Sequence, residues 1–161
     1  MLNLFLLRHG KASKDAASGI DFDRKLNKKG TAQCNQIGYI LAEKELVIDQ
    51  IISSGAARTV ETAEIINHYL KSGPISFHDD LYLAPPQKIV QAISSNGKGK
   101  NVLYVGHNFG ISDVCDYLSG HAMSLSTSQL VHFSFDFDDW QLVSKDTAAF
   151  VETIVPDVHS F

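Results

Sequence analysis

The chain has 161 residues, the length of one ordinary domain, and we predict a single domain over residues 1–161. Hydrophobic residues make up 44% of the chain and charged residues 20%, a composition that excludes a disordered protein. Lys and Arg total 14 against 18 Asp and Glu, so the formal net charge is -4, which argues against nucleic-acid binding.

The first part of the chain predicts a strand, a loop and a helix. Residues 2–7 form a short apolar run, typical of a strand that is buried on both faces, and Arg8-His9-Gly10 follow it. Residues 11–25 are polar and rich in small side chains, which indicates a loop. Asn27 is a suitable N-cap for a helix over residues 28–45.

Strands and helices are then predicted to alternate along the chain. The predicted elements are a strand over 49–54, a helix from Ala56 that Gly73-Pro74 stops, a strand over 75–77, a helix over 85–94, a strand over 101–105 and a helix over 109–118 that Gly120 ends. Residues 130–137 predict a further strand, and residues 140–143 its hairpin partner. This order predicts an α/β fold with a mostly parallel sheet and an antiparallel C-terminal edge.

Polar residues follow three of the predicted strands, where a core does not need them. Arg8 and His9 follow the first strand, Arg58 comes shortly after the second, and His107 follows the strand over 101–105. The carboxyl ends of parallel strands line one crevice, where ligands usually bind. If these strands are neighbours, we expect two arginines and two histidines to converge there.

These side chains suit phosphoryl transfer. Arginine presents a fork of donors that matches phosphate oxygens, and a neutral histidine nitrogen can attack phosphorus to form a phosphohistidine. A second histidine, if protonated, would donate a further hydrogen bond to the transferring group. Because the nucleophile must be neutral while His107 is preferably charged, we expect a limited pH window for activity. We also expect a backbone carbonyl near Gly10 to fix the tautomer of His9.

Four blocks of the sequence resemble the histidine phosphatase superfamily, and they occur in the family's order. They are Leu7-Arg8-His9-Gly10 after the first strand, Asp23 to Gly30, Asp49 to Thr62, and Val102 to Asn108. The short length, Asp80 to Ala84 and the segment from Thr127 to Trp140 are similar to the phosphohistidine phosphatase SixA group.

The resemblance implies a set of residue roles and a fold. His9 would be the nucleophile, Arg8 and Arg58 would bind phosphate, and His107 would complete the catalytic pocket. Independently of the resemblance, Arg24 is a candidate either for substrate binding at the pocket rim or for a simple loop charge, and Thr127 and Ser128 are candidates either for hydroxyls on the pocket floor or for a strand start. The implied fold is a phosphoglycerate mutase-like α/β/α sandwich, which needs neither a metal nor an organic cofactor.

The chain departs from the family at three places. Gly10 stands where the subgroup often has alanine and Gly55 where the family often has proline, and we expect both differences to be sterically mild. Larger members place a carboxylic general acid near residues 81–83, where this chain has Tyr82, with Asp79 and Asp80 just upstream. An alcohol leaves poorly without such an acid, whereas the imidazole of phosphohistidine can leave as a neutral ring. The departure therefore favours a P–N substrate.

We accordingly predict a cytoplasmic, monomeric phosphatase with a signalling role that acts on protein phosphohistidine. The alternatives are a phosphatase for a small metabolite, such as a sugar phosphate or nucleotide, and a noncatalytic phosphoprotein-binding module. We expect no nucleic-acid or membrane partner and no metal. Cys34 and Cys115 are interpreted as core residues, and the remaining histidines as surface or packing residues: His68, His78, His121, His132 and His159.

Overall fold

The structure of the protein is a computed structural model, and it describes residues 1–157. The interpretation of His159 lies outside the described residues. Among those residues, no helix combines the length and the apolar character that are needed to span a bilayer.

The described residues form a six-stranded sheet with the strand order β3-β2-β4-β1-β5-β6. The strands are β1 (Leu2–Arg8), β2 (Gln50–Ser54), β3 (Ile75–His78), β4 (Asn101–Gly106), β5 (Leu130–Phe135) and β6 (Ala149–Ile154). The first four strands in this order pair in parallel, while β5 and β6 pair antiparallel. The predicted mostly parallel sheet with an antiparallel edge is confirmed.

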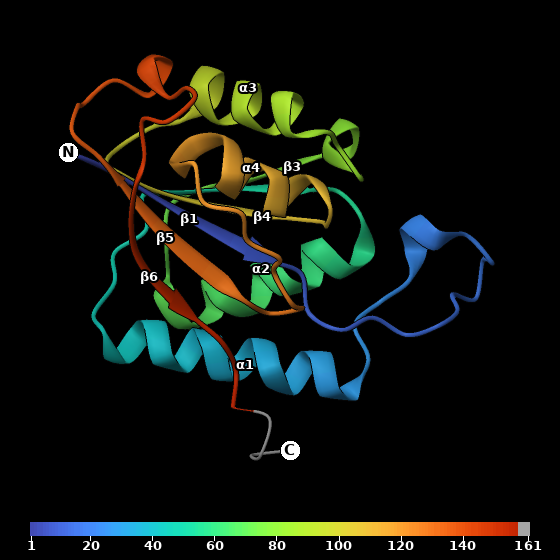
Figure 1. The fold of residues 1–161 in the computed structure, drawn as a ribbon. Coiled ribbons are helices and arrows are strands. Elements are labelled where there is room, and N and C mark those ends of the chain that lie inside the picture. Colours follow the sequence, from blue (N-terminus) through green and yellow to red (C-terminus); the bar gives the residue numbers. More distant parts are fainter. Residues whose placement is uncertain (158–161) are drawn as a thin grey trace.

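Helices cover both faces of this sheet, as Figure 1 shows. Helices α1 (Lys28–Glu43) and α2 (Ala57–Leu70) bury Ile37 and Ile66 in a core on one face. Helices α3 (Pro86–Asn96) and α4 (Gly110–Ser119) bury Ile93 and Val114 in a second core on the other face. Each fully buried side chain of this size contributes roughly 1.5–3 kcal/mol through removal from water. The protein is therefore a three-layer α/β/α sandwich.

The helix boundaries follow from local signals in the sequence. The Asn27 side chain accepts a hydrogen bond from the Gly30 N–H at 2.8 Å and caps the start of α1. Pro86 occupies the first turn of α3, where its missing N–H costs nothing. Helix α4 ends at Gly120, whose φ of 75° is a left-handed conformation that glycine adopts readily. These three predictions are confirmed.

The predicted hairpin at the C-terminal end is wrong. Residues Trp140–Leu142 form a short 3-10 helix, and β5 pairs instead with β6. The reason is the burial of Trp140, whose Nε1–H donates to the Gly99 carbonyl at 2.8 Å and draws this segment toward α3. Most of β6 is exposed, so its sequence lacks the alternating pattern that would have indicated a strand.

Strands β2, β4 and β1 are neighbours at the centre of the sheet, and their carboxyl ends lie together. Arg8 of β1 lies opposite Gly106 of β4, and Ser53 of β2 lies opposite Val105. The loop over residues 11–25 extends past the end of β1 (Figure 1). The residues that follow these three strands therefore share one edge of the sheet.

Candidate active site

His9 follows β1 directly and is 8% exposed. Its Nδ1 lies 2.7 Å from the Gly10 carbonyl oxygen. Because a carbonyl only accepts, Nδ1 carries the proton and Nε2 keeps a free lone pair. Burial, assisted by the charges of Arg58 and Arg8, lowers the pKa of His9 to about 4. His9 is thus neutral at neutral pH, and the predicted carbonyl partner is confirmed.

His107 follows β4, and its ring centroid lies 5.2 Å from that of His9. Its Nε2 is 2.8 Å from Ser54 Oγ, which itself accepts a hydrogen bond from the Ala56 N–H at 3.3 Å. In the tautomer in which the Ser54 hydroxyl donates its hydrogen bond to Nε2, the imidazole proton lies on Nδ1. Nδ1 is buried and makes no hydrogen bond within residues 1–157.

The protonation state of His107 differs from the sequence expectation. Burial, followed by repulsion from His9 and Arg58, lowers the pKa of His107 to about 3, so the ring is neutral rather than charged. A neutral ring with its proton on Nδ1 still offers one N–H donor. The hydrogen bond that was expected from a charged histidine is therefore available without the charge.

The two arginines converge on these rings. Arg58 lies in the first turn of α2, and its side chain is 4% exposed. Burial of the Arg8 side chain, followed by the nearby charge of Arg58, lowers the pKa of Arg8. The charges of both arginines also lower the pKa of His9. The Nε atoms of Arg8 and Arg58 are buried and make no hydrogen bond within residues 1–157. An unpaired buried donor is costly, and the oxygens of a phosphoryl group would satisfy both donors.

Asp21 and Tyr82 also belong to this cluster, and the sequence analysis missed both. Asp21 accepts from Arg58 through its backbone oxygen at 2.9 Å and through Oδ2 at 3.1 Å. The Tyr82 hydroxyl donates to the same Oδ2, and the Tyr82 ring lies 5.4 Å from the His107 ring. The one available signal was Tyr82 itself, which stands where related proteins place an acid.

Arg24 lies at the rim of the cluster. Its Nε donates to Asp21 Oδ1 at 2.8 Å, and its Nη1 donates to the Ser13 carbonyl at 2.7 Å. Arg24 therefore braces the loop over residues 11–25 internally and orients the Asp21 carboxylate, which also binds Arg58. From the segment that contains Thr127 and Ser128, the Ser128 backbone N–H donates to the carbonyls of Arg8 and His9 at the end of β1.

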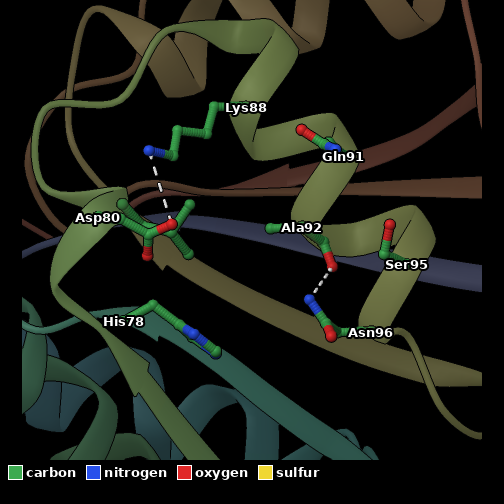
Figure 2. Close-up of a pocket in the computed structure, with 8 residues that line it drawn as sticks. His78, Asp80, Lys88, Gln91, Ala92, Ser95 and Asn96 are labelled. Atoms are coloured by element: carbon green, nitrogen blue, oxygen red, sulfur yellow. Dashed lines mark hydrogen bonds and ion pairs between the residues drawn. The ribbon is translucent and has the colours of Figure 1, made fainter.

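Of the two aspartates weighed as general acids, Asp80 lies in a different contact. Figure 2 shows Asp80 beside a polar cavity between β3 and α3, where it pairs with Lys88 at 3.6 Å. His78 lies beside the same cavity and bonds Ser76 Oγ through Nε2 at 3.0 Å. Asp79 packs against Gly55. Within residues 1–157, no three His, Cys, Asp or Glu side chains are grouped to hold a metal ion.

The expectation of a sterically mild difference is wrong for Gly10 and is not contradicted for Gly55. A Cβ at residue 10 would lie 2.6 Å from Cys34 Sγ, and one at residue 55 would lie 1.9 Å from Asp79 Oδ1. Cys34 is buried and the Gly30 carbonyl also lies 3.0 Å from the added Cβ, so residue 10 has little room for a side chain, whereas the exposed Asp79 carboxylate can rotate away from residue 55. Cys34 and Cys115 are both buried, as their interpretation as core residues requires.

The buried neutral histidines predict a loss of stability in acid. Unfolded histidine titrates near 6.5, whereas folded His9 and His107 titrate at about 4 and about 3. Between these pKa values the unfolded chain binds more protons than the folded chain does. The free energy of unfolding should therefore fall as the pH drops below about 6.5. The urea midpoint should therefore be lower at about pH 5 than at about pH 7. A variant with both histidines replaced by Gln should show a smaller decrease, and an equal decrease would contradict the assigned protonation states.

Comparison with known proteins agrees with this geometry. The family model for the histidine phosphatase superfamily (branch 1) matches residues 4–82. An uncharacterised chloroplastic protein of Arabidopsis thaliana is 28% identical over an alignment 150 residues long, and the match covers 86% of this chain and 68% of that protein. The chain belongs to the histidine phosphatase superfamily, and it is a phosphatase.

Solved structures place the chain more closely within this superfamily. A candidate phosphohistidine phosphatase SixA of Agrobacterium tumefaciens is similar with a TM-score of 0.84 and 25% identity, covering 96% of this chain and 98% of that one. The protein histidine phosphatase SixA in complex with tungstate has the same fold, with a TM-score of 0.81 and 20% identity, over 96% of this chain and 97% of that one. The protein is a SixA-like member of the superfamily.

The mycobacterial glucosyl-3-phosphoglycerate phosphatase, a metabolite phosphatase, also shares the fold. Its TM-score is 0.66 and its identity 14%, over 94% of this chain and 97% of that one.

Proposed function

We propose that the protein removes the phosphoryl group from a phosphohistidine of another protein, through a covalent intermediate on His9. The observation that carries this proposal is the neutral Nε2 of His9, held in a fixed tautomer beside three buried N–H donors that lack partners within residues 1–157. A nucleophile and a set of donors for phosphoryl oxygens are the two parts that such a reaction needs.

In the first step, His9 Nε2 attacks phosphorus in line with the leaving group. A bond forms between Nε2 and phosphorus, the bond from phosphorus to the leaving nitrogen breaks, and its electron pair goes to that nitrogen. The Nε–H groups of Arg8 and Arg58 and the Nδ1–H of His107 hydrogen-bond the equatorial oxygens, over which charge spreads.

In the second step, water hydrolyses the intermediate. The water oxygen bonds to phosphorus, the bond to Nε2 breaks and returns its electron pair to His9, and the water proton leaves with the phosphate or to solvent. The protein returns to its starting state, with the Nδ1 proton of His9 still held by the Gly10 carbonyl.

The arrangement around the cluster supports a P–N substrate. Asp80 is paired with Lys88, and the Tyr82 hydroxyl donates a hydrogen bond to Asp21. Burial, followed by its hydrogen bond to Asp21, raises the pKa of Tyr82, which makes it a poorer acid. An imidazole leaving group can depart as a neutral ring, whereas an alcohol needs a proton from an acid. A small-metabolite phosphatase is the second candidate, because a metabolite phosphatase shares the fold.

A substrate panel tests this function. Phosphate release should be measured from a phosphohistidine protein, a sugar phosphate, a nucleotide and an aryl phosphate, with the His9→Ala variant as control. We expect kcat/KM for the phosphohistidine protein to exceed that for the sugar phosphate and nucleotide by at least about 10²-fold, the size of a missing general-acid contribution. Comparable values for the phosphohistidine protein and the sugar phosphate would instead favour the metabolite phosphatase.

A further inference from the structure

Asp21 lies on the solvent side of the candidate phosphate site. Its side chain is 50% exposed, whereas that of Arg58, to which it is paired, is 4% exposed. His9 and His107 are also buried. A phosphoryl group that enters from solvent and reaches His9 must keep its leaving group on the exposed side, and this is the side on which the Asp21 carboxylate lies.

The Asp21 carboxylate retains capacity for one more hydrogen bond. Its Oδ1 accepts from Arg24 Nε, and its Oδ2 accepts from Arg58 Nη2 and from the Tyr82 hydroxyl. A carboxylate accepts about four hydrogen bonds in total, so one position remains on Oδ1. These three donors come from separate segments and fix the orientation of the carboxylate.

Asp21 is held in its charged form. The hydrogen bond from Tyr82, followed by those from Arg24 and Arg58, holds the pKa of Asp21 well below its usual range. The group is therefore an acceptor at every physiological pH and has no proton to give to a departing alkoxide. An anionic acceptor is what a protonated imidazole ring requires.

We propose that Asp21 accepts a hydrogen bond from the ring N–H of the phosphohistidine leaving group and so selects P–N substrates over phosphate esters of alcohols. This inference rests on the proposed function. The carboxylate stabilises the ring that carries both the phosphoryl group and a proton. When His9 Nε2 bonds to phosphorus, the P–N bond breaks and its electron pair neutralises the ring, which leaves as imidazole with its remaining N–H on Asp21.

The Asp21→Asn variant tests this role against a purely structural one. The amide keeps the shape of the side chain and one acceptor oxygen, which can serve Arg58 and Tyr82, but it loses the charge and the second acceptor oxygen, to which Arg24 donates. Two substrates are compared: a phosphohistidine peptide, and an aryl phosphate that leaves as a stabilised anion without protonation. Both need Arg58, so the aryl phosphate reports any displacement of that arginine. We expect kcat/KM for the phosphohistidine peptide to fall about 10²-fold, and that for the aryl phosphate to change less than about 3-fold.

A second readout is the pH profile for the phosphohistidine peptide. A paired carboxylate raises the pKa of an imidazole ring, so the alkaline limb of kcat/KM should move about one unit lower in the variant. Asp23→Asn is the matched control, because Asp23 lies in the same short 3-10 helix and accepts from Ser18 Oγ at 2.7 Å. It should leave both substrates and the pH profile unchanged.

The outcomes separate this inference from the proposed function. If wild-type protein hydrolyses the aryl phosphate but not the phosphohistidine peptide, the proposed function itself is wrong. If wild-type protein hydrolyses both substrates and Asp21→Asn lowers both equally with an unmoved pH profile, Asp21 only positions Arg58 and the inference is overturned.

Discussion

Replacing His9 with Ala should abolish the phosphoenzyme and lower kcat by at least about 10⁴-fold, as loss of a covalent nucleophile does. The reason is that His9 supplies the free Nε2 lone pair in the cluster, whereas the Nε2 of His107 is bound to Ser54. The measurement is the fraction of protein that carries label after brief exposure to ³²P-labelled substrate and an alkaline quench, which preserves P–N bonds.

His78→Ala is the matched control for this experiment. His78 also lies at the carboxyl end of a strand, but it faces the polar cavity beside α3 and bonds Ser76. The His78→Ala protein should carry the same fraction of label as the wild-type protein. Label that persists on the His9→Ala protein would assign the nucleophile to another residue.

Arg58→Lys should lower kcat/KM by about 10²–10³-fold, the usual effect of removing one donor from a charged transition state. Lysine keeps the charge but has no Nε–H in a planar fork, so it cannot bind Asp21 through its outer nitrogens while presenting a further N–H to phosphate. Steady-state kinetics with an aryl phosphate measures the loss.

Arg24→Lys provides the comparison for this arginine. Arg24 makes the same kind of contact with Asp21, but its side chain is 27% exposed and lies at the rim. The kcat/KM of the Arg24→Lys variant should fall by less than about 10-fold, since an exposed charge pair contributes little. Equal losses in the two variants would show that the arginines act only by holding Asp21.

The main features of the fold follow from signals that are local in the sequence. The buried runs of β1, β2 and β4 are short and nearly continuous, and Asn27, Pro86 and Gly120 mark helix ends by their own chemistry. The convergence of His9 and His107 needed one further assumption, that β1 and β4 are neighbours. Their parallel pairing confirms it.

The missed features depend on contacts between distant segments. Asp21 lies in a polar loop, and only the folded chain brings it to Arg58 and Tyr82. The neutral state of His107 results from burial, which the residues next to it in the sequence do not indicate. The 3-10 helix that begins at Trp140 replaces the predicted hairpin because Gly99, far away along the chain, provides the hydrogen-bond acceptor.

The contact between Gly10 and Cys34 constrains how this protein can have diverged from relatives with alanine after the histidine. The space for a methyl group at residue 10 is taken by the sulfur atom, and the carbonyl of Gly30 lies 3.0 Å away on another side. An exchange at residue 10 therefore requires the Cys34 sulfur to move or residue 34 to become smaller. The two positions should change together during evolution, and a chimaera that receives the Arg-His-Ala loop alone should be less stable than one that also has a smaller residue at position 34.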